Sequence, residues 1–135
     1  MTPIDPFRLT PPSLLARARR RPPGRARQAA LARVNHEIAR ANREAIDGAD
    51  AVLAVLDGTD VDSGTAAEIG YAFARGKRIV GYRGDVRVTG DNEGAVVNLQ
   101  VEYFVRASGG TIAARLSGAV RALRTAGSSS SRRTR

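Results

Sequence analysis

Residues 50–83, DAVLAVLDGTDVDSGTAAEIGYAFARGKRIVGYR, decide the fold of this chain. Residues 51–56 form a run of Ala, Val and Leu without a polar interruption, which is typical of a strand buried on both faces of a parallel sheet. A polar turn, a helix of small and apolar residues, and a second apolar strand over 77–82 follow. Strand, helix and strand with short links make a right-handed βαβ unit. The sequence therefore predicts an α/β fold with a parallel sheet.

Four acidic residues gather around the end of the first predicted strand. That strand ends at Asp57-Gly58, and ligands bind at the carboxyl ends of strands in open α/β sheets. Asp60 and Asp62 lie in the turn, and Glu68 lies in the first turns of the helix. All four could be turn formers or acids favoured by the helix dipole. We prefer that interpretation for Asp60, and we interpret Asp62 and Glu68 as candidate catalytic residues.

The limits of this helix can also be predicted. Either Asp62 or Ser63 can accept hydrogen bonds from the first amide groups of the helix. Gly76 is suited to closing it, because glycine adopts the left-handed conformation that commonly ends a helix.

Residues 60–85 closely resemble the signature region of the nucleoside 2-deoxyribosyltransferase family. In that family an Asp lies six residues before a Glu, which is followed by a Gly and a helix of small residues. Asp62 and Glu68 have this spacing, and EIGYA at 68–72 matches the core of the motif. The resemblance covers about residues 41–105. It implies a flavodoxin- or Rossmann-like parallel sheet sandwiched between helices.

The resemblance implies an enzyme that breaks the N-glycosidic bond of 2′-deoxynucleosides. The carboxylate of Glu68 would attack the anomeric carbon, and the covalent deoxyribosyl ester would pass its sugar to another base or to water. Asp62 would hydrogen-bond or protonate the departing base, as in retaining glycosidases, which use two carboxyl groups. No cofactor is implied. The chain has no Cys and a single His, His36, so we expect no metal site.

The resemblance also suggests which residues bind the substrate, a 2′-deoxynucleoside or its 5′-monophosphate, and the free nucleobase. Asn98-Leu99-Gln100 resembles a later family element whose Asn reaches into the neighbouring subunit's site, which implies a homo-oligomer with Asn98 at the interface. Asn42 stands where many members carry an Asp that contacts the sugar, although an ordinary polar helix residue is an equal interpretation. The predicted binding residues are Asn42, Asp57, Gly58, Ser63, Gly64 and Asn98.

The first 26 residues are rich in proline and arginine, and we predict that they form a loop. Residues 1–12 contain four of the six prolines, and residues 13–27 contain six arginines and no acidic residue. Clustered arginines attract polyanions, but no aromatic residues are interleaved for base stacking. We favour a solvated, mobile loop over a nucleic-acid site. Family members normally begin with a further strand, helix and strand, so we expect an N-terminally truncated fold.

The remaining chain predicts one domain over residues 1–126 with a disordered polar tail over 127–135. Apolar spacing predicts helices over 25–46 and 95–107, and a last helix that ends near Thr125. A short edge strand is expected at 111–113. We find no membrane-spanning run and no signal peptide, so a cytoplasmic protein is the expectation.

Two other classes of function remain open at this point. One is a non-catalytic family member that binds a nucleoside or nucleotide, or serves as an assembly partner. The other is a basic protein that binds nucleic acid through residues 17–27, whose binding would weaken strongly in moderate salt.

Overall fold

The computed structural model describes residues 2–87, 90 and 92–125, so the predicted tail at 127–135 lies outside the described residues. The chain divides into an N-terminal unit, Met1–Gly48, and a C-terminal unit, Ala49–Arg135. The stretch predicted as one domain thus contributes to two compact units. Among the described helices, none combines the length and the apolar character needed to cross a membrane.

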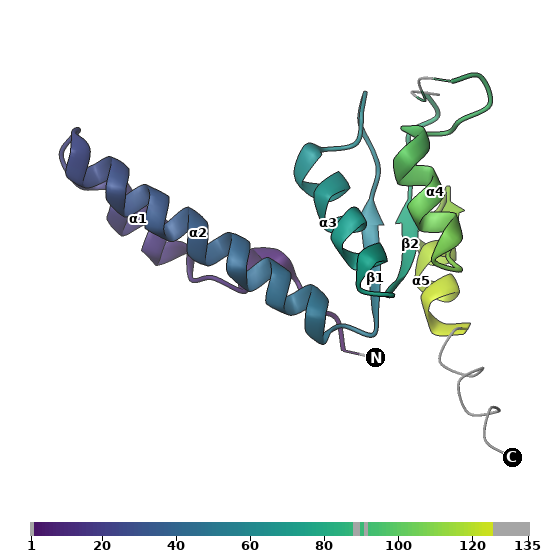
Figure 1. Ribbon diagram of the computed structural model, residues 1–135, viewed down its shortest axis with the longest axis horizontal. Helices are drawn as coiled ribbons and strands as arrows, with labels where there is room; N and C mark the ends of the chain where they lie inside the picture. Colours follow the sequence, from purple (N-terminus) through teal and green to yellow (C-terminus); the bar gives the residue numbers. More distant parts are fainter. Residues whose placement is uncertain (1, 88–89, 91, 126–135) are drawn as a thin grey trace, which may run out of the picture. The chain divides into compact units, whose positions relative to one another are not determined.

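The N-terminal unit is a helical hairpin (Figure 1). A short 3-10 helix, η1 (Pro6–Arg8), precedes α1 (Pro12–Arg19) and the long helix α2 (Arg25–Gly48). The predicted loop over 1–26 is therefore wrong for α1. Pro12 occupies the start of that helix, where proline is favoured because the first amide groups need no partner within the helix.

The C-terminal unit contains a three-stranded parallel sheet in the order β1-β2-β3. Leu53 of β1 lies opposite Val80 of β2, and Gly81 of β2 lies opposite Ile112 of β3. This arrangement confirms the predicted α/β class and the βαβ unit. In chain order the elements are β1 (Ala51–Val55), α3 (Ser63–Ala74), β2 (Arg78–Tyr82), α4 (Leu99–Ala107), β3 (Ile112–Ala113) and α5 (Leu116–Arg124).

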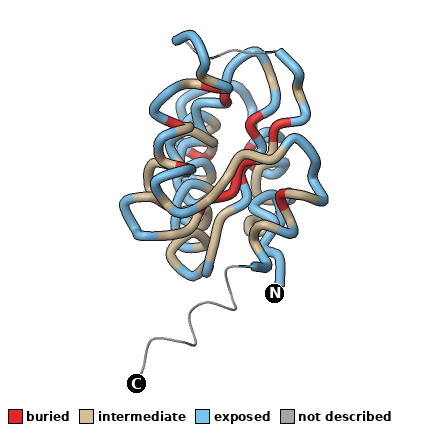
Figure 2. Tube along the Cα trace, turned by 90° about the vertical axis from the view of Figure 1, so that its right-hand side faces the viewer, coloured by how far each residue is buried: buried red, intermediate tan, exposed pale blue. Residues whose placement is uncertain are grey.

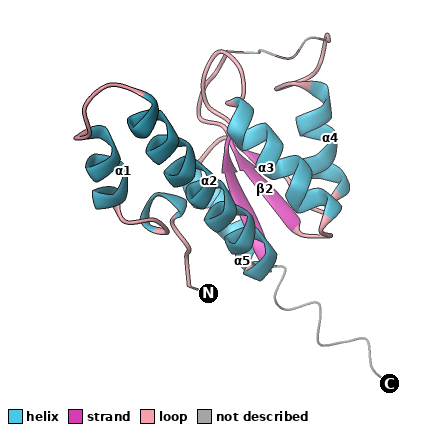
Figure 3. Ribbon diagram, turned by 60° about the vertical axis from the view of Figure 1, so that its left-hand side comes forward, coloured by secondary structure: helices cyan, strands magenta, loops and turns pink. Residues whose placement is uncertain are grey.

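Helices cover both faces of the sheet (Figure 3). α3 and α4 pack against each other on one face, as two successive right-handed crossovers require, and α5 contacts the strands from the other face. The buried positions follow the strands and the inner sides of the helices (Figure 2). The largest fully buried side chains are Leu56, Ile69, Ile79, Val80, Val97 and Val105.

Gly81 allows this core to close around the central strand. A Cβ atom at position 81 would lie 2.6 Å from Cδ1 of Leu56 and 3.1 Å from Cγ1 of Ile112. Only a residue without a side chain leaves room for both apolar neighbours, so Gly81 lets Leu56 pack across β2.

β1 is less buried than its sequence predicts. Ala54 is buried, but Leu53 is 36% exposed and Val55 is 56% exposed. The prediction of burial on both faces was wrong because β1 is an edge strand in the described sheet. Helices that pack mainly over the central strand cover an edge strand only in part.

The ends of two helices test the predicted boundaries. α3 ends at Ala74 and Gly76 follows with a φ of 68°, which confirms that this glycine closes the helix. The helix predicted over 95–107 begins only at Leu99, because Asn98 caps α4 and the preceding residues are not helical.

Candidate active site

Asp62 caps the N-terminus of α3. Its Oδ2 accepts a hydrogen bond of 3.1 Å from the backbone amide of Thr65 and one of 3.5 Å from Oγ1 of the same residue. Of the two capping residues predicted, Asp62 is thus the one that caps, and Ser63 is the exposed first residue of the helix. In the described part of the chain, Oδ1 of Asp62 has no hydrogen-bond partner, so this oxygen is available to a ligand.

Gly64 leaves space for the carboxylate of Asp62. A Cβ atom at position 64 would lie 3.0 Å from Oδ2 of Asp62. Such a contact is tighter than real side chains normally make, so a larger residue would require the carboxylate to shift by a few tenths of an ångström. Gly64 is thereby a support for Asp62 in this structure.

Glu68 lies about one and two-thirds turns farther along the same helix and is half-buried. At about 1.5 Å per residue, it is about 9 Å from Asp62 along the axis. The Cα–Cβ bonds of a helix tilt toward its N-terminus, so the side chain of Glu68 leans toward the end that Asp62 caps. Ile69 and Ala72 are fully buried, and their packing fixes the rotation of α3 that places Glu68.

Asp57 connects the ends of β1 and β2. Its Oδ1 accepts hydrogen bonds of 2.7 Å from the backbone amide of Gly84 and 3.0 Å from that of Asp85. One oxygen of this predicted substrate-binding residue is therefore used to join the two strand ends.

Arg83 makes the reciprocal connection, and the sequence interpretation did not identify it. Its Nη1 donates to the carbonyl oxygen of Leu56, and its Nη2 donates to that of Gly58 at 3.3 Å. The residue is only 3% exposed. We call Asp57 and Arg83 the strand-end clamp, because each side chain binds the backbone beyond the other's strand. The available signal was an arginine placed directly after an apolar strand.

The turn between β1 and α3 is shaped by local interactions. Gly58 has a φ of 119°, a conformation that side-chain-bearing residues rarely adopt. Oδ1 of Asp60 accepts a 2.7 Å hydrogen bond from the backbone amide of Val61, which confirms Asp60 as a turn former. The turn therefore leads the chain from the strand-end clamp to Asp62.

Asp85 adds a fixed negative charge just after the clamp. The hydrogen bond from the Arg87 side chain, together with one from the Arg87 backbone amide, holds the pKa of Asp85 well below its usual range. The guanidinium of Arg87 and the carboxylate of Asp85 thus form a local pair at the end of β2. We call the neighbouring edge of the sheet, which carries Asp57, Asp60, Asp62 and Glu68, the acidic rim.

The two predicted asparagines lie in different units. Asn98 caps α4, where its Oδ1 accepts hydrogen bonds from the amides of Gln100 at 3.0 Å and Val101 at 3.5 Å. Asn42 is half-buried on α2 in the N-terminal unit. Their contacts with a substrate or a partner subunit remain predictions from the sequence.

Within the described residues, no group of three or more His, Cys, Asp or Glu side chains could hold an ion. What the rim does offer is the carboxylate of Asp62 at a helix end and that of Glu68 on the same helix, beside two clamped strand ends.

The crystal structure of a conserved protein from Enterococcus faecalis V583 is similar to this fold. The two chains are 27% identical with a TM-score of 0.56, and the match covers 65% of this chain. The chain spans 64% of the length of that protein. No curated protein matches the sequence.

A sequence profile of the family described as Nucleoside 2-deoxyribosyltransferase matches residues 4–100. This stretch contains β1, α3 and β2, including the pair Asp62 and Glu68 on which the sequence resemblance depends. The match extends over more than half of the chain. The chain therefore belongs to the nucleoside 2-deoxyribosyltransferase family.

Proposed function

We propose that this protein cleaves the N-glycosidic bond of 2′-deoxynucleosides through a covalent deoxyribosyl ester on Glu68. The observation that carries the proposal is the placement of Asp62 and Glu68. They share the N-terminal half of one helix at the carboxyl end of a parallel strand, the edge where such sheets bind ligands.

In the first step, an oxygen of the Glu68 carboxylate forms a bond to C1′ of the sugar. The bond between C1′ and the base nitrogen breaks, and its electron pair leaves with the base. Asp62 hydrogen-bonds or protonates that nitrogen, which stabilises the leaving group. In the second step, another base or a water molecule attacks C1′ and releases the carboxylate of Glu68, with loss of a proton from the attacking group.

The surrounding residues position these two carboxyl groups. The strand-end clamp holds the backbone of Leu56 and Gly58, and the following turn ends at the cap made by Asp62. Ser63 and Gly64, at the start of α3, are the proposed contacts for the sugar, together with Asp57 and Gly58. Small residues at a helix N-terminus leave backbone amide groups accessible to ligand oxygens.

Mass spectrometry of the intact protein tests the covalent step directly. The purified chain is incubated with 2′-deoxynucleosides and, separately, with their 5′-monophosphates, without an acceptor base. We expect a mass increase of one deoxyribosyl unit together with release of the free base. The adduct should be absent in Glu68→Gln and present in Glu44→Gln, because Glu44 is an exposed residue of α2.

Two outcomes would contradict the proposal. An adduct that persists in Glu68→Gln would assign the nucleophile to another residue. If no substrate gives an adduct or a free base while nucleosides still bind, the protein is a non-catalytic binding member. Adding a second base to the adduct distinguishes transfer from hydrolysis, since only transfer gives a new nucleoside.

We further propose that the active protein is a homo-oligomer in which Asn98 contributes to the neighbouring subunit's site. Support comes from the family element that Asn98-Leu99-Gln100 resembles. A mixture of Glu68→Gln and Asn98→Ala chains should recover part of the activity that each variant lacks, because mixed oligomers contain sites with both residues intact. Absence of recovery after mixing and refolding would contradict a shared site.

A further inference from the structure

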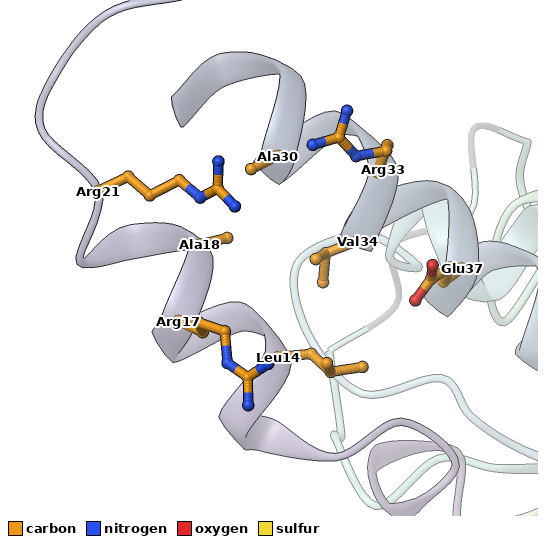
Figure 4. A pocket seen from close by; sticks show the side chains of 8 residues that line it. All are labelled: Leu14, Arg17, Ala18, Arg21, Ala30, Arg33, Val34 and Glu37. Carbon is orange, nitrogen blue, oxygen red and sulfur yellow. The ribbon is translucent and has the colours of Figure 1, made fainter. Parts of the chain in front are cut away.

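The hairpin of the N-terminal unit contains an open groove of about 160 Å³ between α1 and α2 (Figure 4). Ala18 and Ala30 are the buried residues of this unit within its described part, and both line the groove. The full lining consists of Leu14, Arg17, Ala18 and Arg21 from α1 and its end, with Ala30, Arg33, Val34 and Glu37 from α2.

Three arginines from two segments line this groove. Arg17 lies in the last turn of α1, and Arg21 lies two residues beyond the end of that helix. Arg33 approaches from α2, and Glu37 follows it by one turn. Figure 4 shows Arg21 and Glu37 at opposite ends of the groove.

These arginines lack the acidic partners that the chain provides elsewhere. Arg40 pairs with Glu44, Arg87 with Asp85, and Arg106 with Glu102. Within the described residues, by contrast, the three groove arginines take part in no ion pair or hydrogen bond. The sequence between residues 6 and 36 contains no acidic residue, and Glu37, which lines the same groove, forms no ion pair with these arginines in the described structure.

Like charges brought together on packed helices repel one another, so the groove arrangement costs stability unless an anion neutralises it. Guanidinium groups are also suited to phosphate, because their donors form paired hydrogen bonds with two oxygens of one phosphate group. The groove has no aromatic side chain for base stacking, and the carboxylate of Glu37 opposes the approach of an anion at one end.

We propose that this groove binds a compact phosphate-bearing anion, of the size and charge of a diphosphate group. Arg17, Arg21 and Arg33 bind the phosphate oxygens, and Glu37 limits how far the anionic group extends. All residues that line the groove belong to the N-terminal unit, and none of them is among the residues proposed to contact the substrate.

Two triple variants that lose the same number of positive charges distinguish a specific binding site in the groove from general attraction of anions by the basic segment. Arg17→Gln, Arg21→Gln and Arg33→Gln are combined in the first. The matched control combines Arg19→Gln, Arg20→Gln and Arg25→Gln, which are exposed residues of the same hairpin that do not line the groove. Circular dichroism verifies that both variants keep their helix content.

The probe is inorganic pyrophosphate, added to the full chain in a low-salt buffer. Binding is measured by calorimetry and by the rise in melting temperature that a ligand of the folded state produces. We expect pyrophosphate to bind the wild-type chain and the control triple alike, and to bind the groove triple at least about tenfold more weakly, since three charge-assisted contacts are lost. Glu37→Gln should bind pyrophosphate several-fold more tightly.

Three results would overturn the proposal. Absence of pyrophosphate binding to the wild-type chain is the first. The second is an equal loss of pyrophosphate affinity in the two triple variants, which would show that the basic segment attracts the anion without a specific site. The third result is tighter binding of a single-stranded oligodeoxynucleotide than of pyrophosphate, with the affinity falling steeply with salt in all variants, which would indicate a nucleic-acid surface.

Discussion

At the scale of single residues, Asp62 combines a structural and a chemical task. Oδ2 caps α3 through Thr65, while Oδ1 faces no partner among the described residues. Asparagine caps a helix about as well as aspartate does, but it cannot act as a carboxylic acid. Substitutions can therefore separate the two tasks.

Asp62→Asn should leave the free energy of unfolding within about 0.5 kcal/mol of wild type, whereas Asp62→Ala should lower it by about 1 kcal/mol. Both variants should form the Glu68 adduct on the order of a hundredfold more slowly, because assistance to the leaving base is lost. Urea unfolding and time-resolved mass spectrometry measure the two effects. Asp60→Asn is the control, and wild-type rates in Asp62→Asn would exclude the proposed role.

Arg83 illustrates how a buried cation can stabilise a turn. Its guanidinium donates to the carbonyl oxygens of Leu56, Gly58 and Arg87, so its removal leaves one buried and two part-buried acceptors without these donors. We expect Arg83→Met to lower the free energy of unfolding by about 2–4 kcal/mol. Adduct formation should also slow, because the turn that leads to Asp62 loses its anchor.

The control for Arg83 is Arg87→Met. The Arg87 side chain is 59% exposed, and an exposed ion pair contributes little to stability. In urea unfolding, Arg83→Met should therefore have a clearly lower free energy of unfolding than Arg87→Met. If Arg83→Met were no less stable than Arg87→Met, the clamp would not stabilise the rim.

The site residues could be predicted from the sequence to different extents. Asp62 and Glu68 were identifiable because capping chemistry and motif spacing are local properties of the chain. Arg83 was not, because its role depends on carbonyl groups about 27 positions earlier that only the paired strands bring near. The use of Asp57 as an acceptor for Gly84 and Asp85 depends on the same pairing.

At the scale of elements, α4 has two side chains near its start that accept hydrogen bonds, Asn98 and Glu102, and an ion pair between Glu102 and Arg106. Glu102 accepts a 3.0 Å hydrogen bond from the Val96 amide through Oε2, and a 2.7 Å bond from Nε of Arg106 through Oε1. Burial raises the pKa of Glu102, but the hydrogen bonds from Val96, Arg106 and Val97 and the charge of Arg106 together outweigh it and hold the pKa below the ordinary value of 4.5.

Because the pKa of Glu102 is lower in the folded state than in the unfolded state, its contribution to stability is fully present above about pH 4.5. That contribution is lost as the pH falls through the folded pKa. Melting temperatures between pH 6 and 3 should therefore decline less steeply in Glu102→Gln than in wild type. Glu93→Gln, an exposed loop variant, should follow the wild-type curve. A Glu102→Gln curve parallel to wild type would contradict this.

Elements with a clear apolar pattern and clear end signals were predicted well. The helix α1 and the start of α4 were not, because their end signals are ambiguous in the sequence. β1, α3 and β2 follow from an uninterrupted apolar run, a cap and a closing glycine. α1 was missed because prolines flank it at 11–12 and 22–23, and proline is equally compatible with a loop and with the first turn of a helix. The late start of α4 is set by the side chain of Asn98, while Val96 and Val97 continue the apolar pattern outside the helix.

At the scale of the whole molecule, charge and burial are distributed unequally between the two units. The first 48 residues contain ten of the 22 basic residues and only four of the 13 acidic ones. Their described part buries two alanines, whereas the large buried side chains belong to the C-terminal unit. Burial of apolar surface is the main favourable contribution to folding, so the two units should differ in local stability.

We expect amide hydrogens of α1 to exchange much faster than those of β2 and α4, because short helices with little apolar burial open readily. Hydrogen exchange followed by mass spectrometry of peptic peptides measures this difference on the intact chain. Pyrophosphate should slow the exchange of α1 selectively. Equal protection of α1 and β2 without a ligand would contradict the expectation.

The strand-end clamp also determines when the rim can form during synthesis. Arg83 follows Leu56 by 27 residues, so a ribosome completes β1 and α3 before it adds the guanidinium that binds the carbonyl of Leu56. The amides of Gly84 and Asp85, which bind Asp57, are added later still. The nascent chain therefore carries its proposed nucleophile before the turn beside it is anchored, and translation through residue 85 completes the set of anchors.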